Sequence, residues 1–73
     1  MQKYADTDRD SGVDSFEINA TSITVKFKGT VRTYTYSYQS AGQQHVETMK
    51  RLALSGDDLN AYINTHVKYK YVR

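Results

Sequence analysis

The chain has 73 residues, a net charge of +2 and no cysteine. A chain of this length forms one small domain that buries about 60% of its unfolded surface. The lack of cysteine excludes disulfides and zinc–thiolate sites. No apolar stretch approaches the roughly 20 residues of a membrane span, and no signal-peptide core follows Met1. The composition therefore predicts a soluble cytoplasmic protein with no membrane association.

The charge is unevenly distributed along the chain. Residues 1–17 carry a net charge of −3 and residues 18–73 a net charge of +5. Ordinary charge scatter explains this difference, and it is the favoured explanation because the numbers are small. The alternative is an acidic segment that shields a basic surface until a polyanion displaces it.

Residues 1–12 are polar, and we expect them to form a flexible acidic arm before a single domain at 13–73. Within "DTDRDSGVDSFE", Asp6, Asp8, Asp10 and Glu17 have nearly the ligand spacing of an EF-hand loop. An EF-hand also needs a helix on both sides and a glycine at its sixth position, where this chain has Ser11. We therefore predict no metal site here, and a role for the arm through its charge.

Three segments alternate apolar and polar residues as half-buried strands do, at Val13–Ile18, Ser22–Lys28 and Val31–Tyr38. In the first segment, Phe16 and Ile18 are the expected buried side chains. If Gly29 and Thr30 form a two-residue hairpin loop, the pairing places Tyr34 and Tyr36 on the core face. A three-residue loop would turn both tyrosines to the outer face. The first register packs more apolar area and is favoured.

Helical spacing replaces the alternation after Ser40, which is a candidate N-cap, and Gly56 suits the end of this helix. Asp57 or Asp58 can cap a second helix. The apolar residues of the two helices are Val46, Met49, Leu52 and Ala53, and then Leu59, Ile63 and Val67. The predicted fold is α+β, a three-stranded antiparallel meander with two helices packed on one face, in the order β-β-β-α-α.

His45 and His66 are the candidate catalytic bases, and both fall on the predicted helices. The chain has no cysteine nucleophile, no serine in a recognisable catalytic setting and no phosphate-binding or metal motif. We therefore predict that the protein is not an enzyme and uses no cofactor.

Tyrosines alternate with other residues in "YTYSY" and with lysines in "KYKY". Aromatic faces that stack on bases, together with cations that contact phosphates, bind single-stranded nucleic acid with little sequence preference. The residues that we expect to contact nucleic acid are Lys26, Lys28, Arg32, Lys68, Tyr69, Lys70 and Arg73.

The segments "SGVDSFEI", "ITVKFKG", "YTY", "SAGQQHVETMKRLALSG" and "LNAYI" resemble, in order and spacing, the KTSC domain. This family is named from the C-terminus of some lysyl-tRNA synthetases, and it also occurs alone in small bacterial and phage proteins. The resemblance covers about residues 9–72 and places the family's Tyr-x-Tyr motif at Tyr34 and Tyr36. It implies RNA binding and supplies no catalytic residue. The family's usual proline after this motif is missing here.

The leading hypothesis is thus a small binding module for RNA or single-stranded nucleic acid. The alternative is a phage-encoded inhibitor that binds a host protein such as a CRISPR effector or another nucleic-acid enzyme. Its contact residues would be Asp6, Asp8, Asp10 and Asp14, which could occupy a nucleic-acid channel. An exposed edge strand also leaves a homodimer open as a third hypothesis.

Overall fold

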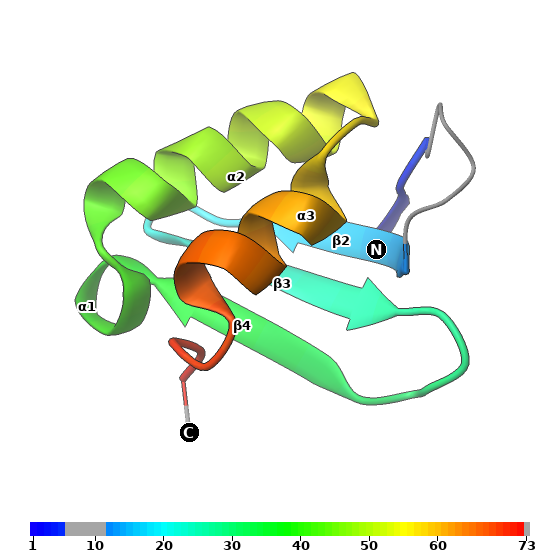
Figure 1. Ribbon diagram of the computed structural model, residues 1–73, viewed down its shortest axis with the longest axis horizontal. Helices are drawn as coiled ribbons and strands as arrows, with labels where there is room; N and C mark the ends of the chain where they lie inside the picture. Colours follow the sequence, from blue (N-terminus) through cyan, green and yellow to red (C-terminus); the bar gives the residue numbers. More distant parts are fainter. Residues whose placement is uncertain (6–11, 73) are drawn as a thin grey trace.

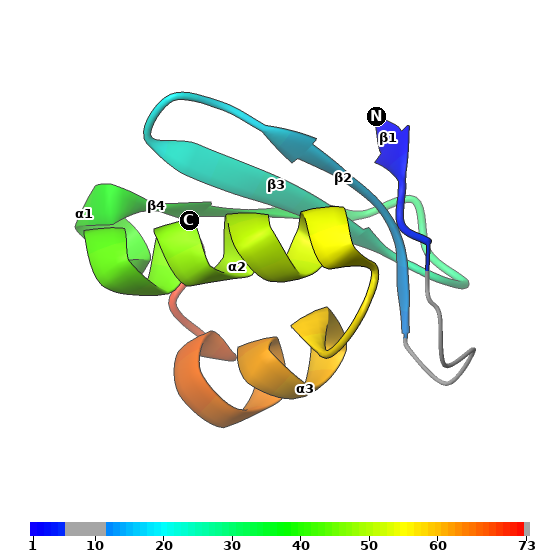
Figure 2. The same cartoon turned by 90° about the horizontal axis from the view of Figure 1, so that it is seen from above.

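The computed structural model describes residues 1–5 and 12–72. It shows an α+β fold in which helices cover one face of a four-stranded antiparallel sheet (Figures 1 and 2). The strands lie in chain order across the sheet. They are β1 (Gln2–Lys3), β2 (Val13–Ile18), β3 (Ser22–Phe27) and β4 (Thr33–Ser37).

The helical layer begins directly after β4. It consists of α1 (Tyr38–Ala41), α2 (Gln43–Ser55), α3 (Leu59–Tyr62) and a π-helical turn, η1 (Ile63–Val67), which continues α3. In Figure 2, α2 and α3 lie on the same side of the sheet. The predicted second helix is therefore present, and its last five residues form the wider π turn.

The strand β1 is the main departure from the predicted three-stranded meander. Gln2 pairs with Phe16, and Lys3 pairs with Ser15, where the sequence predicts an irregular arm. Tyr4 follows β1 into the core, where it is 3% exposed and packs edge-on against Phe16. A two-residue strand is too short to show a period, so alternation could not reveal it. Asp6, Asp8 and Asp10, which have nearly the spacing of calcium ligands, lie outside the described residues.

A bulge in β2 changes which of its side chains are buried. The pairing with β3 shifts between Val13 and Ser15, so Val13 and Phe16 are both buried although they are three residues apart. The prediction that Ile18 is buried is wrong, because this side chain is 37% exposed at the end of the strand.

The predicted register of the β3–β4 hairpin is confirmed. Ile23 pairs with Tyr36 and Val25 with Tyr34, so both tyrosines lie on the face that the helices cover. Gly29 has the expected positive φ, at 80°. The ladder ends at Lys26 and Thr33, earlier than predicted, and residues 28–32 form a longer loop.

The start of the helical layer differs from the prediction at Ser40. This residue belongs to the short helix α1, where it forms a capping box with Ser37. Each residue's backbone N–H donates to the other's hydroxyl oxygen at 3.0 Å. The N-cap of α2 is Gly42, and Gly56 ends α2 in the left-handed conformation, as predicted.

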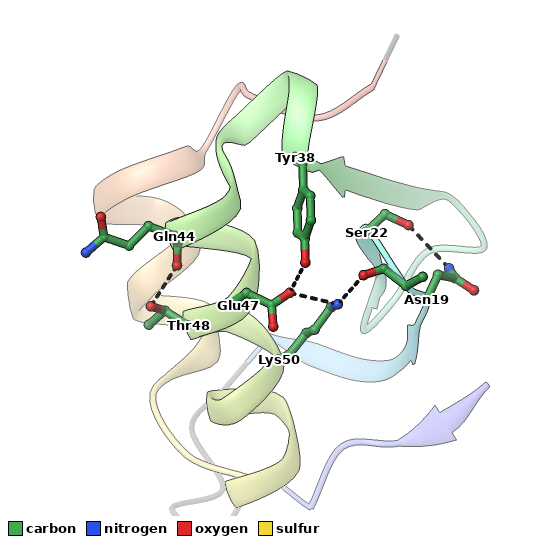
Figure 3. Close-up of polar contacts among 8 residues, drawn as sticks. Asn19, Ser22, Tyr38, Gln44, Glu47, Thr48 and Lys50 are labelled. Atoms are coloured by element: carbon green, nitrogen blue, oxygen red, sulfur yellow. Dashed lines mark hydrogen bonds and ion pairs between the residues drawn. The ribbon is translucent and has the colours of Figure 1, made fainter.

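A polar chain attaches α1 and α2 to the β2–β3 turn (Figure 3). The Tyr38 hydroxyl donates to Glu47 at 2.6 Å, and the Lys50 ammonium group lies 2.9 Å from the same carboxylate. Lys50 also donates to the Ala20 carbonyl at 3.1 Å. The hydrogen bond from Tyr38, followed by that from Lys50, lowers the pKa of Glu47. This network links α1 and α2 to each other and to the turn between β2 and β3.

The two longer helical segments supply the apolar side of the helical layer. Both bury a stripe of side chains against the core face of the sheet. The buried residues are Val46, Met49 and Ala53 from α2, with Leu59, Ile63 and Val67 from α3 and η1. The predicted stripe of the second helix is thus confirmed. Among residues 1–5 and 12–72, no helix is long and apolar enough to cross a membrane.

Candidate nucleic-acid interface

An open cleft of about 330 Å³ lies where the β3–β4 hairpin meets the C-terminal segment. Most of its lining residues are aromatic, and we call it the aromatic cleft. They are Phe27, Thr30, Tyr34, Tyr36, Ile63, Asn64, Lys68, Tyr69 and Tyr71. The cleft is thus built from the sheet's core face on one side and from η1 and the tail that follows it on the other.

Tyr34 lies at the centre of the aromatic wall. Its ring packs edge-to-face against Phe27, with 5.6 Å between centroids, and against Tyr71, at 4.9 Å. Tyr71 also contacts the buried Tyr36 edge-on. Edge-to-face pairs are the favoured packing of aromatic rings, so they hold this wall in a defined shape.

A second hollow of about 420 Å³ adjoins the cleft. It is lined by Arg32, Thr33, Tyr34, Tyr71 and Val72, and we call it the side hollow. Tyr34 and Tyr71 line both spaces and therefore form a shared wall. The Val72 N–H donates to the Thr35 carbonyl at 2.6 Å, which fixes the tail along β4.

Two cations lie at aromatic rings of this surface. The Lys68 ammonium group is 5.4 Å from the centroid of Tyr69, and Lys68 lines the aromatic cleft. The Arg32 guanidinium is 5.8 Å from the centroid of Tyr34 and lines the side hollow. Tyr69 is 67% exposed, so its ring is accessible to a ligand. The surface therefore combines exposed π faces with positive charge.

Tyr36 forms the buried end of the cleft. Burial, with smaller contributions from Tyr34 and Tyr71, raises the pKa of Tyr36 to about 12. Its hydroxyl therefore stays neutral to a higher pH than that of an ordinary tyrosine.

The structure brings together only part of the predicted contact set. Arg32, Lys68 and Tyr69 join the motif tyrosines at the cleft, whereas Lys26 lies on the opposite face of the sheet. There the Lys26 ammonium group is 3.5 Å from the carboxylate of Asp14, one of the acidic residues predicted for the alternative, protein-binding function. Lys28 and Lys70 are exposed but do not line the cleft. Arg73 lies outside the described residues.

Some cleft residues were absent from the predicted set. Tyr71 is the most important of these, since it lines both hollows. The "KYKY" motif could have revealed it, because alternation places Tyr69 and Tyr71 in equivalent positions. Phe27, Ile63 and Asn64 had no signal of their own, since each looks like an ordinary residue of its strand or helix.

Comparisons of the chain with protein-family models, with curated proteins and with solved structures found no match.

Proposed function

We propose that the protein is a non-enzymatic module that binds RNA or single-stranded nucleic acid in the aromatic cleft. The observation that carries the proposal is the exposed Tyr69 beside Lys68 at a cleft walled by Tyr34 and Tyr71. Stacking on such rings contributes about 1–3 kcal/mol per base, and neighbouring cations bind the phosphates.

The dimensions of the two hollows favour an unpaired strand. A volume of about 330 Å³ lies at the lower end of the range of roughly 300–1,000 Å³ for ligand pockets, which suits a single nucleotide. The side hollow shares the wall formed by Tyr34 and Tyr71, so a second nucleotide can follow there, with its phosphate near Arg32. Only bases that are splayed out of a helix can enter such spaces.

The resemblance to the KTSC domain supports the same proposal. The motif residues Tyr34 and Tyr36 both line the aromatic cleft. The family's implied RNA binding and its lack of catalytic residues agree with a binding module, and we include membership of that family in the proposal.

A labelled single-stranded RNA, followed by fluorescence anisotropy at several salt concentrations, tests the proposed function. We expect Lys68→Ala to weaken binding roughly five- to tenfold and to reduce the salt slope by about 1, because one phosphate contact is lost. Tyr69→Ala should weaken binding by at least about fivefold through lost stacking. A duplex of the same sequence should bind more weakly than the single strand.

Lys26→Ala is the matched control, because it removes one lysine from the opposite face of the sheet. Its affinity should stay within about twofold of the unaltered protein. Absence of RNA binding at low salt would refute the proposed function. Equal losses for Lys26→Ala and Lys68→Ala would instead show that binding is diffuse and does not use the cleft.

A further inference from the structure

The stacking rings and cations of the aromatic cleft do not by themselves distinguish one base from another. Every base has a π face that can stack on a ring such as Tyr69, and a cation such as Lys68 contacts the phosphate, which is the same in every nucleotide. Recognition of a base needs a polar group that is fixed at the cleft and meets the edge of the stacked base. A sequence preference must therefore come from the polar side chains that line the cleft.

Apart from the tyrosine hydroxyls, the polar side chains of the lining are those of Thr30, Asn64 and Lys68. The Thr30 hydroxyl oxygen accepts a hydrogen bond from the Arg32 N–H at 3.0 Å, so it is used within the hairpin loop. The Lys68 ammonium group lies at the Tyr69 ring and carries donors only. A tyrosine hydroxyl is a single atom that rotates. Asn64 thus supplies the one planar group of the lining that holds a donor and an acceptor side by side.

The π turn η1 holds Asn64 at the cleft. Ile63 and Val67 of the same turn are buried in the core, whereas Asn64 is exposed. On another side of the turn, the ring of His66 lies 5.5 Å from that of His45 in α2, which fixes the turn against the helical layer. In the part of the chain that the structure describes, the Asn64 amide makes no hydrogen bond. Both its oxygen and its NH₂ group are therefore available to a ligand.

The carboxamide of asparagine is complementary to the Hoogsteen edge of adenine. This edge presents the N6–H₂ donor beside the N7 acceptor, so the amide oxygen accepts from N6 while the amide NH₂ donates to N7. Guanine presents two acceptors, N7 and O6, on the same edge, and pyrimidines have no N7. In an unpaired strand a splayed base exposes this edge to the protein. Of the four bases, adenine therefore makes both hydrogen bonds there.

We propose that Asn64 gives the aromatic cleft a preference for adenine by contacting the Hoogsteen edge of a base that stacks on Tyr69. The inference rests on the proposed function, because it assigns the base at that same site. Asn64 and Lys68 are four residues apart and both line the cleft. One short segment thus contacts the base edge through the amide and the phosphate through the ammonium group.

Anisotropy titrations with four labelled RNAs test this preference. They are an oligouridine and the same oligomer with one central adenosine, guanosine or 7-deazaadenosine. We expect the adenosine oligomer to bind at least about fivefold more tightly than the guanosine oligomer, because guanine cannot form the bidentate pair. It should bind at least about threefold more tightly than the 7-deazaadenosine oligomer, which keeps the stacking ring but lacks the N7 acceptor. In Asn64→Ala, the three purine oligomers should bind within about twofold of one another.

Asn19→Ala is the matched control. Asn19 is an exposed amide in the turn before β3, at the end of that strand away from the cleft residue Phe27, and it donates to the Ser22 hydroxyl at 3.4 Å. This variant should keep the preference for adenosine. Equal affinities of the unaltered protein for the three purine oligomers would overturn the inference and leave the proposed function standing, as would a preference that Asn64→Ala retains. Absence of binding to all four RNAs at low salt would refute the proposed function and the inference together.

Discussion

Tyr34 and Tyr36 alternate along one strand and face the same side of the sheet, yet their surroundings differ. Tyr36 is 1% exposed, whereas Tyr34 is half-buried at the wall between the two hollows. The sequence predicts the shared face from the period of two residues. The difference in burial follows from position: Tyr36 belongs to the buried core, whereas Tyr34 lines both hollows, although Tyr71 packs closer to Tyr34 than to Tyr36.

The raised pKa of Tyr36 predicts a loss of stability at alkaline pH. Between its ordinary value of 10.0 and about 12, the unfolded chain releases this proton while the folded protein keeps it. The free energy of unfolding therefore falls as pH rises through that window, by about 2–3 kcal/mol in total from this group. In urea titrations, the free energy of unfolding should fall less between pH 9 and pH 12 for Tyr36→Phe than for the unaltered protein. An equal fall in both proteins would contradict the assignment.

The start of α3 shows how an element can depend on a residue distant in the chain. The sequence predicts that Asp57 or Asp58 caps this helix. Asp58 occupies the N-cap position, but with a left-handed φ of 65°, and among the described residues its side chain accepts no capping hydrogen bond. The Leu59 N–H donates instead to the Tyr4 hydroxyl at 3.2 Å, in the protein interior.

Replacement of Tyr4 by phenylalanine tests this remote cap. Tyr4→Phe keeps the ring against Phe16 but leaves the Leu59 N–H without its hydroxyl acceptor in the interior. We expect the free energy of unfolding to fall by about 1–3 kcal/mol in urea titrations. Tyr69→Phe alters a residue that is 67% exposed and should change the free energy of unfolding by less than about 0.5 kcal/mol. Similar effects of the two changes would argue against the cap.

At the scale of the whole molecule, the cleft exists because the C-terminal segment returns to the β3–β4 hairpin. The hairpin supplies Tyr34, η1 supplies Ile63, and the tail supplies Tyr69 and Tyr71. The tail is held by the Val72 hydrogen bond to β4 and by the contact of Tyr71 with Tyr34. A substitution at Tyr71 should therefore change both folding stability and RNA binding, whereas a substitution at Tyr69 should change RNA binding alone.

Alanine at each of the two tail tyrosines measures that coupling. Tyr71→Ala should lower the free energy of unfolding by about 2 kcal/mol, because it removes a half-buried ring that packs on two others. Tyr69→Ala should change stability by less than about 0.5 kcal/mol, since its ring is mostly exposed. Both should weaken RNA binding by at least about fivefold in anisotropy titrations. A Tyr71→Ala protein of unchanged stability would show that the tail is not part of the fold.

Local patterns in the sequence determined a large part of the fold. The period of two located β2, β3 and β4 and placed Tyr34 opposite Val25. The helical period located α2 and the stripe of Leu59, Ile63 and Val67. Gly29 and Gly56 marked a turn and a helix end because both adopt positive φ. Each of these features depends on residues close together in the chain, where backbone geometry links spacing to side-chain direction.

Only the tertiary structure decided the remaining features. The strand β1, the cap that Tyr4 provides, the cleft completed by Tyr71 and the pairing of His45 with His66 all join segments far apart in sequence. Such contacts follow from how the layers pack, which no local period encodes. The sequence by itself thus determined β2, β3, β4, α2 and the second apolar helical segment, together with the candidate aromatic residues. Packing decided that Lys26 lies on the other face of the sheet while Lys68 lines the cleft.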